Sequence, residues 1–406
     1  MSSNHVVRSA VGMTLALALV GCGVQANQTA ALRAANGVVA ESVPGELIVK
    51  FKNSATRGPK LLTLGLRQVR SIDKIGAVVV KGGDTKTALA ALKADADVLY
   101  AEPNYVAKAF DLPSMSPNVA FGIRAEDELL KDCWGMNTIH ASDAWKVTTG
   151  ANVKVAVVDT GVDYTHPDLA GRVDKGHDFV NNDDDAKDDH YHGTHCAGTI
   201  GAGLGNGGVV GVAPNVSIVA VKVLSASGSG SYDGVAAGIT YAADSGASIL
   251  SMSLGGPSSS KALEDAVKYA QSKGVLIVAA MGNSGNESVS YPAGIPGVMP
   301  IGATDINDKR ASFSQYGKHI SVSAPGVDVL STVPGGGFKK LSGTSMATPH
   351  TAGLCALVKS AFPDFTADQI RAKVEASTDD QGDAGWDKYF GTGRINALKA
   401  VSPARR

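Results

Sequence analysis

Short apolar runs alternate with amphipathic segments over the second half of the chain. These runs predict strands, and they span residues 153–158, 218–224, 249–254 and 275–280. Between them, residues 232–244 and 263–269 have the spacing of helices, and Gly274 should end the second one. Strands without a polar face are buried on both sides. The pattern therefore predicts an α/β domain over residues 137–406, with a parallel sheet flanked by helices.

The preceding part of the chain, residues 44–108, has a different pattern. Its strand-like and helical runs are short and alternate; they span residues 46–52, 77–80, 85–93 and 98–106. This mixture predicts a small α+β domain. Residues 109–136 then form a connector and the start of the next domain, because Pro113 and Pro117 interrupt regular structure.

The N-terminus has the features of an export signal. Arg8 precedes an apolar stretch at residues 11–20, which is too short to span a bilayer. We therefore expect residues 1–22 to be a signal peptide and residues 23–43 to be a tether. The segment LVGC, which ends at Cys22, resembles a bacterial lipoprotein signal whose cysteine is lipidated; the alternative is an ordinary signal peptide with an incidental cysteine. The protein is expected to be exported, either extracellular or a cell-envelope lipoprotein that touches the membrane only through its lipid.

Charge and cysteine content narrow the partners further. The chain has 37 basic and 38 acidic side chains, a net charge of -1, so no global positive field attracts nucleic acid. We expect a monomer that binds neither nucleic acid nor an organic cofactor. Export permits disulfides, yet Cys133, Cys196 and Cys355 can form at most one bridge, and their spacing does not say which.

Polar residues follow the predicted strands at the edge where parallel sheets carry their chemistry. Asp159 comes directly after residues 153–158, although alone it could be a turn residue. Asn283 follows residues 275–280, where its amide could stabilise an oxyanion or simply form a turn.

Two further segments place chemistry at the start of helices. His192 begins a helix of small residues, and together with His190 and His195 it could instead bind a metal such as zinc. Ser345 opens a helix and could be no more than its cap. Pro349 should then lie in the first turn of that helix, where amide hydrogens have no intrahelical partner.

Together these residues form a nucleophile, a base and a carboxylate that orients the base. The segments that contain them are VVDTGV at residues 157–162, HGTHCAG at residues 192–198 and GTSMATPH at residues 343–350. They resemble the three signature blocks of subtilisin-like serine proteases, the subtilase family, in the family order Asp, His, Ser. The resemblance covers residues 137 to about 401 and implies a serine endopeptidase with the subtilisin-like fold.

The resemblance also implies roles for single residues. Asp159 would orient His192, the general base, while Ser345 would be the nucleophile and Asn283 the oxyanion donor. Protein or peptide substrates would pair as a strand between two segments: Gly228, Ser229 and Gly230 on one side, and Ser253, Leu254 and Gly255 on the other. Both segments could alternatively be plain glycine-rich turns. By the same resemblance, the pocket for the residue before the cut bond would lie between residues 253–255 and 280–282. None of these residues carries a charge, which favours large apolar side chains.

Residues 44–108 are similar to the inhibitory propeptide of this family; an unrelated adaptor domain is the alternative. The similarity implies a zymogen whose propeptide tail occupies the substrate groove until self-cleavage near the connector. The propeptide would then be an intramolecular inhibitor.

Five aspartates precede His192 within seven residues. Their crowding suits calcium, for which we expect Asp183, Asp184, Asp185 and Asp188 to be ligands; a solvated acidic loop is the alternative. Asp168 matches a second calcium position in many relatives, but the companion loop at residues 203–210 is about one residue short.

Two other functions remain open from the sequence. A peptide-binding pseudoenzyme would keep the fold without catalysis. A zinc hydrolase would use His190, His192 and His195, but it would leave the serine segment unexplained.

Overall fold

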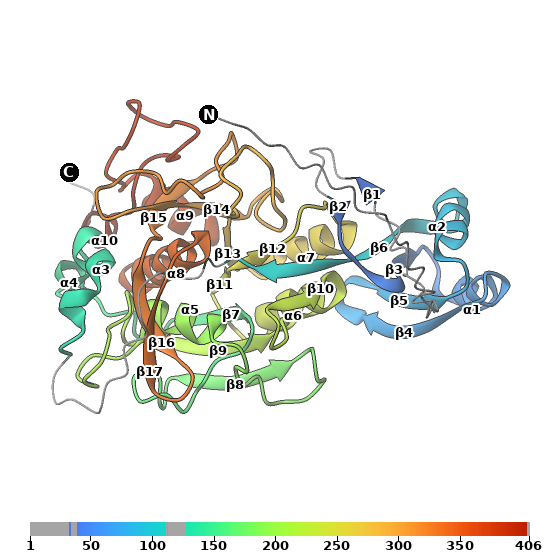
Figure 1. Ribbon diagram of the computed structural model, residues 1–406, viewed down its shortest axis with the longest axis horizontal. Coiled ribbons are helices and arrows are strands. Elements are labelled where there is room, and N and C mark those ends of the chain that lie inside the picture. Colours follow the sequence, from blue (N-terminus) through green and yellow to red (C-terminus); the bar gives the residue numbers. More distant parts are fainter. Residues whose placement is uncertain (1–31, 34–38, 111, 113–126, 404–406) are drawn as a thin grey trace, which may run out of the picture. The chain divides into compact units, whose positions relative to one another are not determined.

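The computed structural model describes residues 32–33, 39–110, 112 and 127–403 (Figure 1). The predicted signal peptide, Cys22 and the prolines of the connector lie outside these residues. No helix in the described part of the chain is both long and apolar enough to cross a bilayer.

The C-terminal region, residues 127–403, is built on a seven-stranded parallel sheet, as predicted. Its strand order is β15-β14-β13-β11-β7-β9-β8, and every neighbouring pair is parallel. The strands are β7 Lys154–Asp159, β8 Val173–Asp178, β9 Ser217–Lys222, β11 Ile249–Met252, β13 Leu276–Ala280, β14 Met299–Thr304 and β15 Val322–Pro325.

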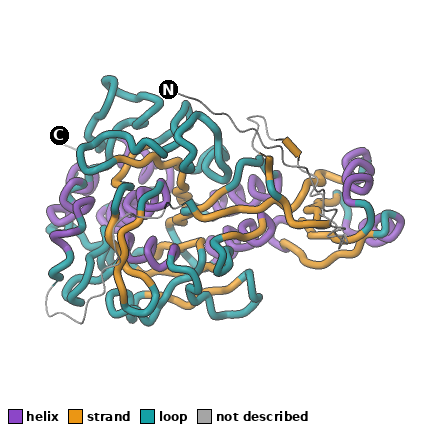
Figure 2. The backbone as a smooth tube through the Cα atoms, viewed as in Figure 1, coloured by secondary structure: helices purple, strands orange, loops and turns teal. Residues whose placement is uncertain are grey.

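Helices cover both faces of this sheet (Figure 2). Strand β7 shows the division, because Val155 and Val157 pack into one apolar core, whereas Ala156 and Val158 pack into the other. The first core also contains α5 His192–Gly201 and α8 Thr344–Ala361, and the second contains α6 Tyr232–Asp244 and α7 Lys261–Ser272. Gly274 lies just beyond Lys273, the C-cap of α7, and has φ +78°.

Smaller elements complete this region. They are η2 Leu130–Asp132, α3 Trp134–Thr138, α4 Ala141–Ala144, the hairpin β16 Val329–Val333 with β17 Gly337–Leu341, α9 Ala367–Glu375 and α10 Ala397–Val401. Helix α9 begins with a capping box formed by Thr366 and Gln369.

The N-terminal region, residues 42–109, is the predicted α+β unit. Its antiparallel sheet has the order β6-β3-β5-β4. The elements are β3 Ser42–Phe51, α1 Ser54–Thr63, β4 Leu66–Ile72, η1 Asp73–Ile75, β5 Ala77–Gly82, α2 Thr85–Ala94 and β6 Val98–Ala109. Within the expected tether, β1 Leu32–Arg33 pairs with β2 Val39–Ala40, and β3 begins before Pro44.

Strand β6 joins the two regions. It pairs with β3 along its first part, and its end lies between β10 Ser229–Ser231 and β12 Leu254–Gly255, antiparallel to both (Figure 1). Ile48 and Ile75 of the N-terminal region share an apolar core with α6 and α7. The end of β6 is thereby held at the carboxyl edge of the parallel sheet.

Candidate active site

Asp159 and His192 are brought together by β7 and α5. The Nδ1 atom of His192 lies 2.7 Å from Oδ1 of Asp159, and both side chains are buried. An ionised carboxylate can only accept, so Nδ1–H donates and Nε2 is left as the basic nitrogen. Gly193 permits this approach, because a Cβ there would lie 2.0 Å from the carbonyl oxygen of Gly161.

Ser345 is the second residue of α8, and its Oγ donates a 2.9 Å hydrogen bond to the carbonyl oxygen of Ser253. The prediction that Pro349 lies in the first turn of this helix is wrong, because Pro349 is the sixth residue of α8. Because proline has no N–H, Pro349 cannot donate the helical hydrogen bond that the Ser345 carbonyl would otherwise accept. That oxygen accepts instead from Ser253 Oγ at 2.8 Å and from Cys196 Sγ at 3.6 Å.

The amide of Asn283 faces the end of the N-terminal region. Its Nδ2 donates a 2.8 Å hydrogen bond to the carbonyl oxygen of Phe110, within the range expected for an oxyanion donor. Its Oδ1 accepts from the main-chain N–H and the Oγ1 of Thr344, each at 2.9 Å. Thr344 thus fixes which end of the amide points to the Phe110 carbonyl. Sequence reasoning missed Thr344, although it directly precedes Ser345.

The predicted substrate-binding segments hold the chain's own strand. Ser229 and Gly230 pair with Lys108 and Ala107, and Leu254 and Gly255 pair with Ala109 and Lys108. The N–H of Ala109 donates to the Gly228 carbonyl at 2.9 Å, and the N–H of Phe110 donates to the Ser253 carbonyl at 3.2 Å. A Cβ on Gly255 would lie 2.9 Å from ring atoms of Phe110, so this ring rests against Gly255. Beyond it, Leu112 donates to Ser342 at 2.8 Å.

The three histidines considered for zinc are engaged in different ways. His195 is buried with Nε2 at 3.0 Å from the Val329 carbonyl and 3.1 Å from that of Lys339; burial lowers its pKa to about 3. His190 stacks on Tyr191 with ring centroids 4.0 Å apart. Within the described residues, the one group of three potential ligands whose atoms lie within 4.8 Å of one another is Asp159, His192 and Cys196. The three histidines therefore do not form a zinc site.

The predicted calcium ligands differ in burial and in their hydrogen-bond partners. Asp188 is buried, and its carboxylate accepts from Thr160 Oγ1 at 2.9 Å, from Thr194 Oγ1 at 2.6 Å and from two main-chain N–H groups. Its role is to tie the turn after Asp159 to the start of α5. Asp184 lies 2.8 Å from His177, and Asp185 accepts from Tyr164 at 2.6 Å.

Asp189, the fifth aspartate of the loop, pairs at 2.6 Å with Nζ of the fully buried Lys222. This ammonium group also donates to the carbonyl oxygens of Thr160 and Leu224. Sequence reasoning missed both Lys222 and the structural role of Asp188, because neither burial nor partners can be read from a run of aspartates.

Asp168 faces the loop at residues 203–210. Its Oδ2 accepts from the N–H of Val209 at 2.9 Å, while Asp127 accepts from Gly205 at 2.8 Å and from Gly207 at 3.3 Å. Burial, with a smaller contribution from Asp127, raises the pKa of Asp168 to about 7. A buried carboxyl that resists ionisation in this way is one that a bound cation would stabilise.

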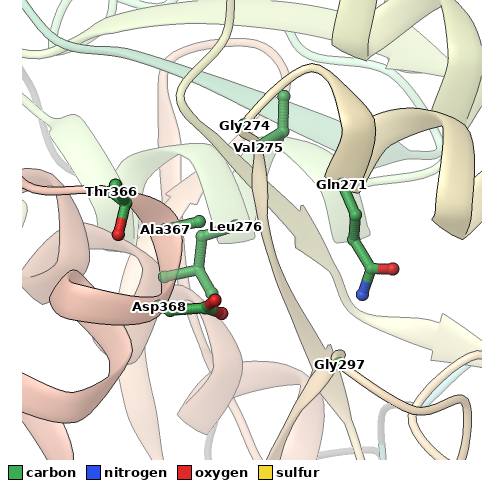
Figure 3. A pocket seen from close by; sticks show the side chains of 8 residues that line it. All are labelled: Gln271, Gly274, Val275, Leu276, Gly297, Thr366, Ala367 and Asp368. Carbon is green, nitrogen blue, oxygen red and sulfur yellow. The ribbon is translucent and has the colours of Figure 1, made fainter.

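None of the three cysteines described forms a disulfide, and all are buried. Burial raises the pKa of Cys133 and of Cys355 to about 12. Cys196 lies beside the Asp159–His192 pair. A surface pocket lies away from these residues, between the end of α7 and the start of α9 (Figure 3). Its lining residues are Gln271, Gly274, Val275, Leu276, Gly297, Thr366, Ala367 and Asp368.

Comparisons with known proteins identify the family of the chain. Residues 150–393 match the Subtilase family, and residues 27–104 match the fervidolysin N-terminal prodomain. The chain is 41% identical to the thermophilic serine proteinase of Bacillus sp. (strain AK1), over 89% of this chain and 88% of that protein. It is 47% identical to thermitase of Thermoactinomyces vulgaris, over 66% of this chain and 95% of thermitase.

Among solved structures, fervidolysin from Fervidobacterium pennivorans, a keratinolytic enzyme related to subtilisin, superposes with a TM-score of 0.80 at 30% identity. The match covers 90% of this chain and 62% of fervidolysin. The chain therefore belongs to the subtilase family. It is a subtilisin-like serine endopeptidase whose N-terminal region is a prodomain, consistent with a zymogen.

Proposed function

We propose that Ser345 cleaves peptide bonds through an acyl-enzyme, with His192 as general base, Asp159 as the group that orients His192 and Asn283 as oxyanion donor. The Ser345 hydroxyl gives its proton to Nε2 of His192 and attacks the substrate carbonyl. His192 then protonates the leaving amine, and a water molecule hydrolyses the ester by the same route. The observation that carries this proposal is the hydrogen bond that Asn283 Nδ2 donates to the carbonyl oxygen of Phe110.

The position of Phe110 also supports a maturation site. The end of β6 pairs with β10 on one side and with β12 on the other, and Phe110 donates to the Ser253 carbonyl, which is the pairing expected of a bound substrate strand. We propose that Ser345 cuts the bond between Phe110 and Asp111, and that the N-terminal region inhibits the enzyme until it dissociates. A large apolar side chain at the position of Phe110 is expected in other substrates too, because its ring rests on the backbone of Gly255.

Replacement of Asn283 by Ala tests the catalytic assignment. It should lower kcat about a hundred- to a thousandfold, the range measured at the corresponding asparagine of subtilisin, with little change in KM. Unchanged kcat would rule out Asn283 as the oxyanion donor. A peptide-binding pseudoenzyme would be favoured if purified mature protein bound peptides without hydrolysing them.

Export, lipidation and calcium are also proposals. Residues 1–22 would direct export, and Cys22 would anchor the enzyme to the cell envelope if it is lipidated.

The carboxylate of Asp188 already accepts hydrogen bonds within the protein. We therefore propose that calcium, when bound at the acidic loop, uses the exposed carboxylates of Asp183, Asp184 and Asp185. Calcium there would stabilise the loop before His192 and take no part in bond cleavage.

A further inference from the structure

Glu102 on β6 binds the first turn of α7 in the C-terminal region. Its carboxylate accepts three hydrogen bonds: from Ser260 Oγ at 2.6 Å, from the N–H of Lys261 at 2.9 Å and from that of Ala262 at 3.1 Å. Both Glu102 and Ser260 are buried. All three donors belong to the C-terminal region, where the amides at a helix start favour negative charge. They form a site for one carboxylate, which here holds Glu102.

Asn104, two residues further along β6, makes a second side-chain contact with the C-terminal region. It is fully buried, and its Nδ2 donates to Oδ1 of Asp233 at 2.7 Å. Its Oδ1 accepts from the main-chain N–H of Asp233 at 3.2 Å. Asp233, in the first turn of α6, therefore contacts both the donor and the acceptor of the Asn104 carboxamide. Within the N-terminal region, Asn104 Nδ2 also lies 3.0 Å from Oε2 of Glu46.

The same strand continues into the cleavage site. If Phe110 is the residue before the cut bond, Asn104 is the seventh and Glu102 the ninth residue before it. Residues two apart on a strand direct their side chains to the same face, so both can reach α6 and α7. When the N-terminal region dissociates after cleavage, Glu102 and Asn104 leave with it. The groups that bound them stay on the mature enzyme.

We infer that Asp233, Ser260 and the N–H groups of Lys261 and Ala262 form an exosite that binds extended substrates. It selects a carboxylate nine residues and a carboxamide seven residues before the cut bond. This inference rests on the proposed function and on cleavage after Phe110. The exosite anchors the far end of a substrate strand whose near end pairs with β10 and β12. A second copy of the chain, presenting its own residues 102–110, meets both requirements.

The test uses the mature enzyme and a donor–quencher peptide with the sequence of residues 102–114. Matched peptides carry Glu102→Gln or Asn104→Ala, and a short anilide with the sequence of residues 107–110 ends before the exosite. Each replacement in the long peptide should lower kcat/KM about tenfold, because a charge-assisted or paired buried hydrogen bond is lost. Equal kcat/KM for the long peptides, with normal cleavage of the anilide, would overturn the exosite. Failure to cleave any of them would refute the proposed function instead.

Ser260→Asp is the matched enzyme variant. It keeps an oxygen that accepts from the N–H of Leu263, as Ser260 does at 3.2 Å, but it places a negative charge against the substrate carboxylate. The variant should favour the Glu102→Gln peptide over the natural one in kcat/KM. An unchanged preference for Glu102 would contradict the assignment of Ser260. If the variant does not fold, the comparison of peptides on the wild-type enzyme still decides the question.

Discussion

The side-chain amide of Asn283 donates a 2.8 Å hydrogen bond to the main-chain carbonyl of Phe110, 173 residues earlier in the sequence. An oxyanion donor must point at a carbonyl that is about to be attacked. We propose that the chain in this way presents its own substrate to Ser345, and the pairing of β6 with β10 and β12 holds Phe110 in place.

The first prediction concerns the residue before the cut bond. Phe, Leu, Tyr and Met should be cleaved about ten- to a hundredfold faster, in kcat/KM, than Lys, Arg or Glu. A charged side chain would lose water beside Gly255 without gaining a partner, whereas each buried CH₂ gains about 0.8 kcal/mol. A series of tetrapeptide anilides that differ only at this residue measures the preference. Faster cleavage after Lys, Arg or Glu would contradict a neutral pocket.

The second prediction concerns acid stability. Burial lowers the pKa of His195 to about 3 and that of His350 to about 4, both below the ordinary value of 6.5. Between pH 6.5 and its lowered pKa, each histidine binds a proton in the unfolded chain but not in the folded chain. The free energy of unfolding should therefore fall as the pH falls below about 6.5, by up to about 1.4 kcal/mol per pH unit for each histidine. The raised pKa of Asp168 has the opposite effect: below about pH 7, this group makes the free energy of unfolding rise as the pH falls.

Urea unfolding of a Ser345→Ala protein, which cannot digest itself, measures this dependence. Adding His350→Gln isolates one histidine, since Asp168 is present in both proteins. The double variant should lose less stability between pH 6.5 and pH 4 than the single variant. Parallel pH profiles for the two proteins would mean that His350 is not a buried neutral group.

The third prediction concerns calcium. Binding to the native state alone adds RT ln(1 + [L]/Kd), about 2.7 kcal/mol at a hundredfold excess over Kd, so the melting temperature should rise with calcium. Changing Asp183, Asp184 and Asp185 to Asn should remove most of the rise, whereas Asp188→Asn should destabilise the protein with or without calcium. If the triple variant responds like the wild type, the ion binds elsewhere, and Asp168→Asn is then the variant to measure.

The fourth prediction concerns Cys196, the thiol beside His192, the proposed general base. A bulky mercurial should inactivate the enzyme, because Cys196 Sγ lies close to His192 and 3.6 Å from the Ser345 carbonyl. Cys196→Ala should stay active and become resistant. Equal sensitivity of this variant would direct attention to Cys133 or Cys355.

Sequence patterns predicted the parallel sheet well because β7 and β13 are continuous apolar runs. They missed β8, whose residues VDKGHD carry four polar side chains on an outer strand. The rule for proline failed at Pro349, since tertiary partners from Ser253 and Cys196 satisfy the carbonyl that proline leaves open.

The pairing of Asp159 with His192 could be expected, because one directly follows an apolar strand and the other begins a helix of small residues. The contact between Phe110 and Asn283 could not, because main-chain register between distant segments leaves no local signal. Likewise, Asp188 looks like its neighbours in sequence, and burial alone separates it from Asp183 and Asp185.

The N-terminus of the mature enzyme tests the central claim most directly. Wild-type protein should be cut once after Phe110, so that Edman sequencing and intact mass place Asp111 first. Purified Ser345→Ala should stay uncut, since loss of the corresponding serine in subtilisin lowers turnover about a millionfold. A different first residue, or normal processing of Ser345→Ala without any other protease, would contradict the account.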